Sequence, residues 1–118
     1  VNLQLGGGTM INIGIINCAE VAKKCSGTGC VNAFNENRGS FDKYVFKNAE
    51  IVSFAQCHGC SENATEGVVI EANKMKDKGV KTIHISTCIR GRCKWYSEFV
   101  DELSRDFEVV DYTHGRKK

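Results

Sequence analysis

The sequence predicts an α/β fold: a small open three-layer sandwich whose four-stranded, mostly parallel sheet carries helices on both faces. Four short, nearly continuous apolar runs alternate with segments of helical periodicity, the pattern of strands that crossover helices bury on both sides. Three of these runs end at a cysteine, namely Cys18, Cys57 and Cys88. Right-handed crossovers make the strand order 2-1-3-4 the simplest arrangement.

Strands are predicted at each of the four apolar runs, which cover residues 11–16, 51–54, 82–85 and 107–112. None of these runs shows the regular polar alternation of a strand with one face in water. Each is therefore expected to lie in a sheet covered on both faces. The first crossover holds two weaker helical segments, over 32–37 and 41–47, which are divided at Gly39.

A stronger helix is predicted between the second and third strands. Asn63 and Glu66 form a capping box, and Gly79 ends the periodic segment. Its apolar face consists of Ala64, Val68, Ala72 and Met75. A last helix is predicted after Cys93, where an apolar stripe is formed by Trp95, Phe99 and Leu103.

The chain length favours one domain, because 118 residues bury enough surface for a core without disulfides. Residues 10–118 are expected to form this domain. The glycine-rich residues 1–9 differ from the rest and are expected to be an expression scar or an upstream linker, with Met10 as the native start.

The composition excludes several classes of function. Lys and Arg number 16 against 14 Asp and Glu, and they are spread along the chain, so no nucleic-acid partner is expected. No membrane association is expected either, because no apolar run approaches the roughly 20 residues of a membrane span. A cytoplasmic location is the default expectation. There, seven cysteines point to metal or redox chemistry.

The strongest site signal is the pair Cys57 and Cys60. Two thiols separated by two residues in a polar turn can hold one metal ion or close one disulfide. Cys18 and Cys88 each follow a predicted strand. Because parallel strands end at one edge, where ligands bind in open α/β sheets, these four thiols are expected to meet at the carboxyl edge.

Other residues near this edge are weaker candidates. Four of them are possible additional ligands in the neighbouring loops: Cys25, Cys30, Cys93 and His114. His84 falls inside the third strand and is interpreted as a packed imidazole with one backbone partner. His58 lies within the cysteine pair and has no assigned role, and Arg90 and Arg92 are interpreted as solvated loop residues.

Two familiar motifs are excluded. A phosphatase loop requires an arginine six positions after its cysteine, but Lys24 follows Cys18 at that spacing and Lys94 follows Cys88. The glycines near Cys30 lack a P-loop ending and the third glycine of a dinucleotide fingerprint, so nucleotide binding is not expected.

The order of the cysteines along the chain resembles that of the CGGC-domain family, from about residue 11 to residue 114. The matching segments are Ile13–Cys18, Cys25 with Gly27, Ile51–Phe54 leading to Cys57–Cys60, Ser86–Ile89, Cys93, and Thr113 with His114. His58 replaces the first glycine of the turn that names the family, and Asn17 stands where arginine is common. The resemblance implies metal binding and no established reaction or substrate.

The leading hypothesis is therefore a metal site with thiolate ligands from Cys18, Cys57, Cys60 and Cys88. Zinc is the first choice, and an iron-sulfur cluster is the alternative, because both take four thiolates. A thiol-disulfide redox protein using Cys57 and Cys60 is the second hypothesis, and the absence of proline disfavours it. A metal-assisted enzyme that acts on a small anion held by Arg90 or Arg92 ranks third. No protein partner is identified.

Overall fold

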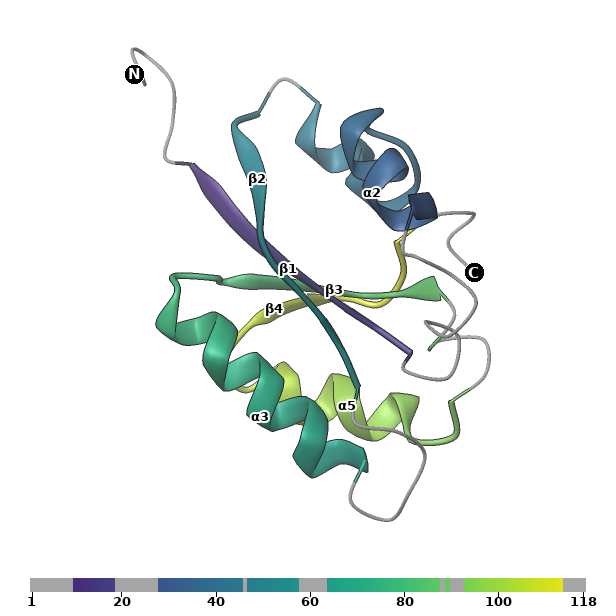
Figure 1. Ribbon diagram of the computed structural model, residues 1–118, viewed down its shortest axis with the longest axis vertical. Coiled ribbons are helices and arrows are strands. Elements are labelled where there is room, and N and C mark those ends of the chain that lie inside the picture. The colour runs from purple at the N-terminus through teal and green to yellow at the C-terminus, as the bar shows by residue number, and fades with distance from the viewer. Residues whose placement is uncertain are drawn as a thin grey trace.

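The structure of the protein is a computed structural model that describes residues 10–18, 28–45, 47–57, 64–87, 89 and 93–113. Within these residues, four strands form a single sheet in the order β2-β1-β3-β4 (Figure 1). Every pair of neighbouring strands is parallel. The α/β class and the strand order 2-1-3-4 predicted from the sequence are therefore confirmed.

The strands follow the apolar runs closely. Their bounds are β1 Ile11–Asn17, β2 Ala49–Gln56, β3 Thr82–Ile85 and β4 Glu108–Val110. Only β4 is shorter than predicted. It pairs with β3 over the three positions from Thr82 to His84, so its ladder stops before Asp111.

The four helices given below lie where the sequence places helices, but their bounds agree less well. They are α2 Thr28–Asn35, the 3-10 helix η1 Gly39–Tyr44, α3 Ala64–Asp77 and α5 Tyr96–Leu103. Thus α2 begins four residues before the predicted start at Asn32. Gly39 has a φ of 58°, a left-handed conformation that suits glycine, where η1 begins. In the described part of the chain, no helix is both long and apolar enough to span a membrane.

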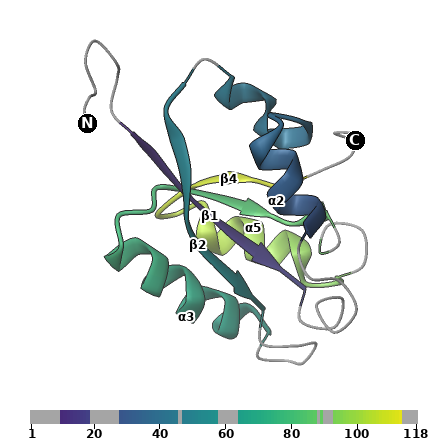
Figure 2. The ribbon, with the colours of Figure 1, turned by 45° about the horizontal axis from the view of Figure 1, so that its top comes forward.

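The helices cover both faces of the sheet (Figures 1 and 2). One apolar cluster lies on the side of α3 and α5 and includes Ile16, Val68, Met75, Ile83 and Phe99. The other lies on the side of α2 and η1 and includes Ile13, Ile15, Ala33, Phe41 and Tyr44. Successive residues of β1 thus point to opposite faces, as strand geometry requires.

Two local features adapt β1 to its neighbours. The β1–β2 register shifts between Ile13, which pairs with Ile51, and Gly14, which pairs with Ser53. Val52 is the extra residue on β2, so the strand carries a bulge there. Gly14 faces α3 so closely that a Cβ atom added to it would lie 2.5 Å from Sδ of Met75.

Candidate functional site

Cys18 and Cys57 follow neighbouring strands directly at the carboxyl edge of the sheet. The last residue of β1, Asn17, pairs with the last residue of β2, Gln56. The backbone N–H of Cys57 also donates to the carbonyl oxygen of Asn17 at 2.8 Å, which extends the ladder by one residue. The two cysteines therefore occupy adjacent positions at this edge.

Both thiols belong to the face of α3 and α5. Cys18 and Cys57 are each 6 % exposed, and both lie in the apolar cluster that includes Ala64 at the start of α3. Apolar surroundings of this kind limit the access of water to a metal site and thereby set the redox potential of a bound metal. The two residues fit a soft thiolate ligand set in both chemistry and location.

The end of β3 reaches the same edge. The backbone N–H of Ser86 donates to the carbonyl oxygen of Ile16 at 2.9 Å, so the chain continues beside β1 for one residue past Ile85. Cys88 lies two positions further along and falls outside the described residues. The other predicted site residues outside them are Cys25, His58, Cys60, Arg90, Arg92 and His114.

The sheet separates the two described loop cysteines. Cys93 is half-buried, packs against the same cluster as Cys18 and Cys57, and donates its backbone N–H to Ile89 at 2.9 Å. Cys30 is 5 % exposed and lies in the cluster on the opposite face, with α2. The sequence places both at the carboxyl edge but does not reveal that they face different sides.

Cys30 sits in a small polar network on the α2 side. Its Sγ lies 3.2 Å from Oγ1 of Thr113, a fully buried residue that follows β4. Thr113 Oγ1 accepts the backbone N–H of Thr87 at 3.3 Å, and Thr113 returns its own N–H to Thr87 Oγ1 at 3.1 Å. These bonds join the first turn of α2 to the chain segments that follow β3 and β4.

Asn17, the last residue of β1, is a buried polar residue whose burial the sequence does not predict. It is 3 % exposed, and its Oδ1 has no hydrogen-bond partner among the described residues. Most buried polar groups in proteins are paired, so this unpaired oxygen at the carboxyl edge of the sheet is unusual. The available sequence signal is that a polar residue directly follows the apolar residues Ile15 and Ile16.

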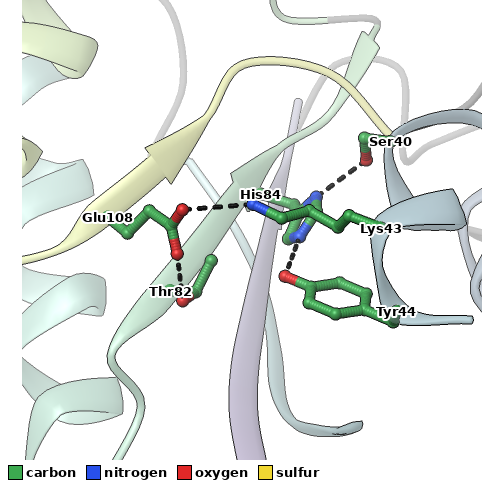
Figure 3. A network of polar contacts seen from close by, with 6 residues as sticks. All are labelled: Ser40, Lys43, Tyr44, Thr82, His84 and Glu108. Carbon is green, nitrogen blue, oxygen red and sulfur yellow. Dashed lines mark hydrogen bonds and ion pairs between the residues drawn. The ribbon is translucent and has the colours of Figure 1, made fainter. Parts of the chain in front are cut away.

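His84 also lies on the α2 side and has more partners than predicted (Figure 3). It is fully buried, and Ser40 Oγ lies 2.8 Å from its Nδ1. Ser40 Oγ also lies 3.2 Å from the Thr113 carbonyl oxygen, so one tautomer pairs every group: the Ser40 hydroxyl donates to that carbonyl and Nδ1–H donates to Ser40. Nε2 then accepts the Tyr44 hydroxyl at 2.8 Å.

Burial shifts the pKa values in this network. It lowers the pKa of His84 to about 4, although a contact with the Tyr112 backbone opposes the shift. Burial, assisted by Glu108, raises the pKa of Tyr44. The hydrogen bond from Lys43 lowers the pKa of Glu108, across an ion pair of 3.1 Å between Lys43 Nζ and Glu108 Oε2. His84 is therefore a neutral structural residue at physiological pH.

Among the residues that the structure describes, no group of three or more His, Cys, Asp or Glu side chains is arranged to hold a metal ion. Of the four leading candidates, Cys18 and Cys57 are described and adjacent. Cys60 comes three positions after Cys57, and Cys88 two positions after Ser86. Such short tethers reach at most about 10 Å, because an extended chain spans roughly 3.5 Å per residue.

The family model described as the CGGC domain matches residues 12–114, which is nearly the whole chain. No curated protein and no solved structure matches the chain significantly.

Proposed function

Because the chain belongs to the CGGC-domain family, we propose that it binds a metal through cysteine thiolates at the carboxyl edge of its sheet. The proposed ligands are Cys18, Cys57, Cys60 and Cys88. The observation that carries the proposal is the placement of Cys18 and Cys57, which are buried on the same face at the ends of adjacent parallel strands.

The donor set agrees with this placement. Cys57 and Cys60 have the spacing with which two thiolates commonly hold one zinc ion. Cys18 would supply a third sulfur beside Cys57, and Cys88, which follows Ser86 by two positions in the sequence, would supply the fourth. Four thiolates satisfy either a tetrahedral zinc ion or an iron-sulfur cluster. Zinc is the first choice, because the Cys-x2-Cys spacing is typical of structural zinc sites.

The test is metal and acid-labile sulfide analysis of protein purified without oxygen in the presence of a reductant. We expect about one zinc per chain and no visible colour from zinc binding, whereas an iron-sulfur cluster gives iron, sulfide and broad visible absorption. The double variant Cys57→Ser, Cys60→Ser is expected to lose nearly all of the metal. A serine hydroxyl does not replace the low-pKa thiolate that the metal requires.

The chain offers a matched control in Cys30. This cysteine is as buried as Cys57, but it lies on the opposite face of the sheet. Cys30→Ser should therefore retain the metal. If the double serine variant retains it as well, the thiolate site is wrong. A wild-type protein without metal that shows a reversible Cys57–Cys60 disulfide would instead support the thiol-disulfide redox function.

A further inference from the structure

Thr113 is a fully buried polar residue that bonds to the segment after β3. Its Oγ1 accepts the backbone N–H of Thr87 at 3.3 Å, and its own N–H donates to Thr87 Oγ1 at 3.1 Å. The two residues thus hold each other through both backbone and side chain. Because a buried hydroxyl is unfavourable without such partners, the pair favours this one arrangement, and Thr113 fixes the place of Thr87.

Thr113 is itself held from the α2 side. Its carbonyl oxygen accepts the backbone N–H of Ser40, in η1, at 2.9 Å, and Ser40 Oγ lies 3.2 Å from the same oxygen. Thr113 Oγ1 lies 3.2 Å from Sγ of Cys30 in α2. Ser40 also contacts His84 of β3, as Figure 3 shows. The helices on this face therefore determine the position of Thr113.

The segment that Thr113 fixes leads directly to the proposed ligand Cys88. Thr87 and Ile89 are the neighbours of this cysteine in the sequence. Ile89 is fully buried in the apolar cluster on the side of α3 and α5, and its N–H donates to the carbonyl oxygen of Ser86 at 3.1 Å. The chain is thus anchored directly before Cys88 by Thr113 and directly after it by the core.

The anchor at Thr113 matters because the ladder of the sheet ends before Cys88. Cys57 donates its backbone N–H to β1, so the sheet holds it in place. β3 ends at Ile85, and its pairing with β1 continues only as far as Ser86 in the described part of the chain. Groups that orient the ligands of a metal without touching the metal contribute strongly to affinity, and their loss typically weakens binding about 10–100-fold.

We infer that Thr113 is a positioning residue of the metal site: through its bonds to Thr87, it holds Cys88 within reach of the other thiolate ligands. This inference rests on the proposed function. Thr113 bonds to groups on the α2 side, so it acts through the chain at the edge of the sheet and not by contact with the metal. Loss of its hydroxyl should therefore weaken the binding of a metal while every thiolate ligand is still present.

The test is titration of the reduced, metal-free protein with Co²⁺, a coloured probe for thiolate sites. Thr113→Val keeps the shape of the side chain but removes the hydroxyl. We expect it to bind Co²⁺ about 10–100-fold more weakly than the wild type, with weaker cobalt–thiolate absorption per bound ion. Thr113→Ser returns the hydroxyl and should restore both quantities.

Thr82→Val is the matched control. Thr82 is also buried, and its Oγ1 donates to Glu108 Oε1 at 3.0 Å, but it begins β3 at the amino end of the strand. This variant loses a comparable hydroxyl far from the proposed ligands. It should therefore bind Co²⁺ as the wild type does.

Thr87→Val removes the oxygen that accepts the Thr113 N–H, so it should also weaken Co²⁺ binding, even if Thr113→Val folds poorly. Three results overturn the inference and leave the metal site standing: wild-type affinity and absorption in folded Thr113→Val, no effect of Thr87→Val, or an equal loss in Thr82→Val. A wild type that binds no Co²⁺ overturns the proposed function, and the inference falls with it.

Discussion

His84 shows how a single buried residue makes stability depend on pH. Its imidazole stacks on Phe41, with ring centroids 4.4 Å apart, and both of its nitrogens have hydrogen-bond partners. In the neutral form, Nδ1–H donates to Ser40 and Nε2 accepts from Tyr44. Protonation of Nε2 would place a new N–H against the Tyr44 hydroxyl, which donates to that nitrogen in the neutral form. It would also bury a positive charge.

The free energy of unfolding is expected to fall as the pH is lowered from 6.5 towards 4. The unfolded chain takes up a proton at His84 near its usual pKa of 6.5, whereas the folded protein does so only at about 4. The unfolded state thus binds more protons in this range, and the full loss is about 3 kcal/mol. Urea unfolding between pH 7.5 and pH 5, with a chelator present, measures the upper part of this change.

The matched variant is His84→Gln, which does not titrate. It should be less stable than the wild type at pH 7.5, and its stability should change less between pH 7.5 and pH 5. Glu108 stabilises the folded protein while it is ionised, and its lowered pKa means that this stabilisation is lost only at pH values below about 4.5. Glu108 therefore does not affect the comparison above pH 5. Equal pH dependence of the two proteins would show that His84 is not the responsible group.

At the scale of elements, the contact between β1 and α3 depends on the absence of a side chain at Gly14. Met75 is fully buried on the inner face of α3, and Val80 lies beside it. A Cβ atom at Gly14 would approach Met75 Sδ to 2.5 Å and Val80 Cγ1 to 3.4 Å. The helix can approach the strand this closely because the strand has no Cβ there.

Gly14→Ala is expected to lower the free energy of unfolding by about 1–3 kcal/mol, the usual cost of overpacking a core. Chemical denaturation of the wild type and the variant measures this loss. In a Met75→Ala background, the new methyl group occupies space that the methionine has left, so the added cost should be smaller. If the cost of Gly14→Ala is the same in both backgrounds, the contact with Met75 does not explain it.

The elements differ in how well the sequence predicts them. β3 agrees residue for residue with its apolar run, because a strand covered on both faces leaves a continuous apolar signal. The start of α2 at Thr28 is not visible in the same way, because Gly29 is a poor helix former and no capping box precedes it. The last helix is predicted after Cys93 with Trp95 in its apolar stripe, but α5 begins at Tyr96 and Trp95 is its N-cap.

At the scale of the whole molecule, the sheet separates the described cysteines onto two faces. Cys18, Cys57 and Cys93 belong to the side of α3 and α5, whereas Cys30 belongs to the side of α2. A disulfide requires two cysteines whose Cα atoms lie within about 7 Å and whose side chains point toward each other. Cysteines that pack on opposite faces of a sheet cannot meet this requirement unless the protein unfolds.

Air oxidation of metal-free protein is therefore expected to produce disulfides without joining Cys30 to Cys93. Peptide mapping under non-reducing conditions, after digestion at low pH to prevent exchange, identifies the pairs. We expect at least one disulfide among the edge cysteines, and metal loading before exposure to air should suppress it, because a coordinated thiolate is protected. A Cys30–Cys93 peptide from natively oxidised protein would contradict the two-sided arrangement.

The candidate site was predictable only where it follows from strand ends. Parallel pairing brings Cys18 and Cys57 to one edge, and the apolar runs before them indicate that pairing. The face on which a side chain lies is harder to predict, because it depends on counting strand residues one by one up to an uncertain boundary. The burial of Asn17 was missed for this reason, since a polar residue after an apolar run resembles the start of a loop.

The bulge at Val52 has a consequence for the behaviour of the protein at high concentration. β2 is an edge strand of eight residues, and it contains neither proline nor lysine. A straight edge of this length offers a row of backbone groups to which another chain can pair, as in aggregation. The extra residue bends and twists the strand, which interrupts that row. The bulge thus opposes edge-to-edge aggregation of neighbouring molecules.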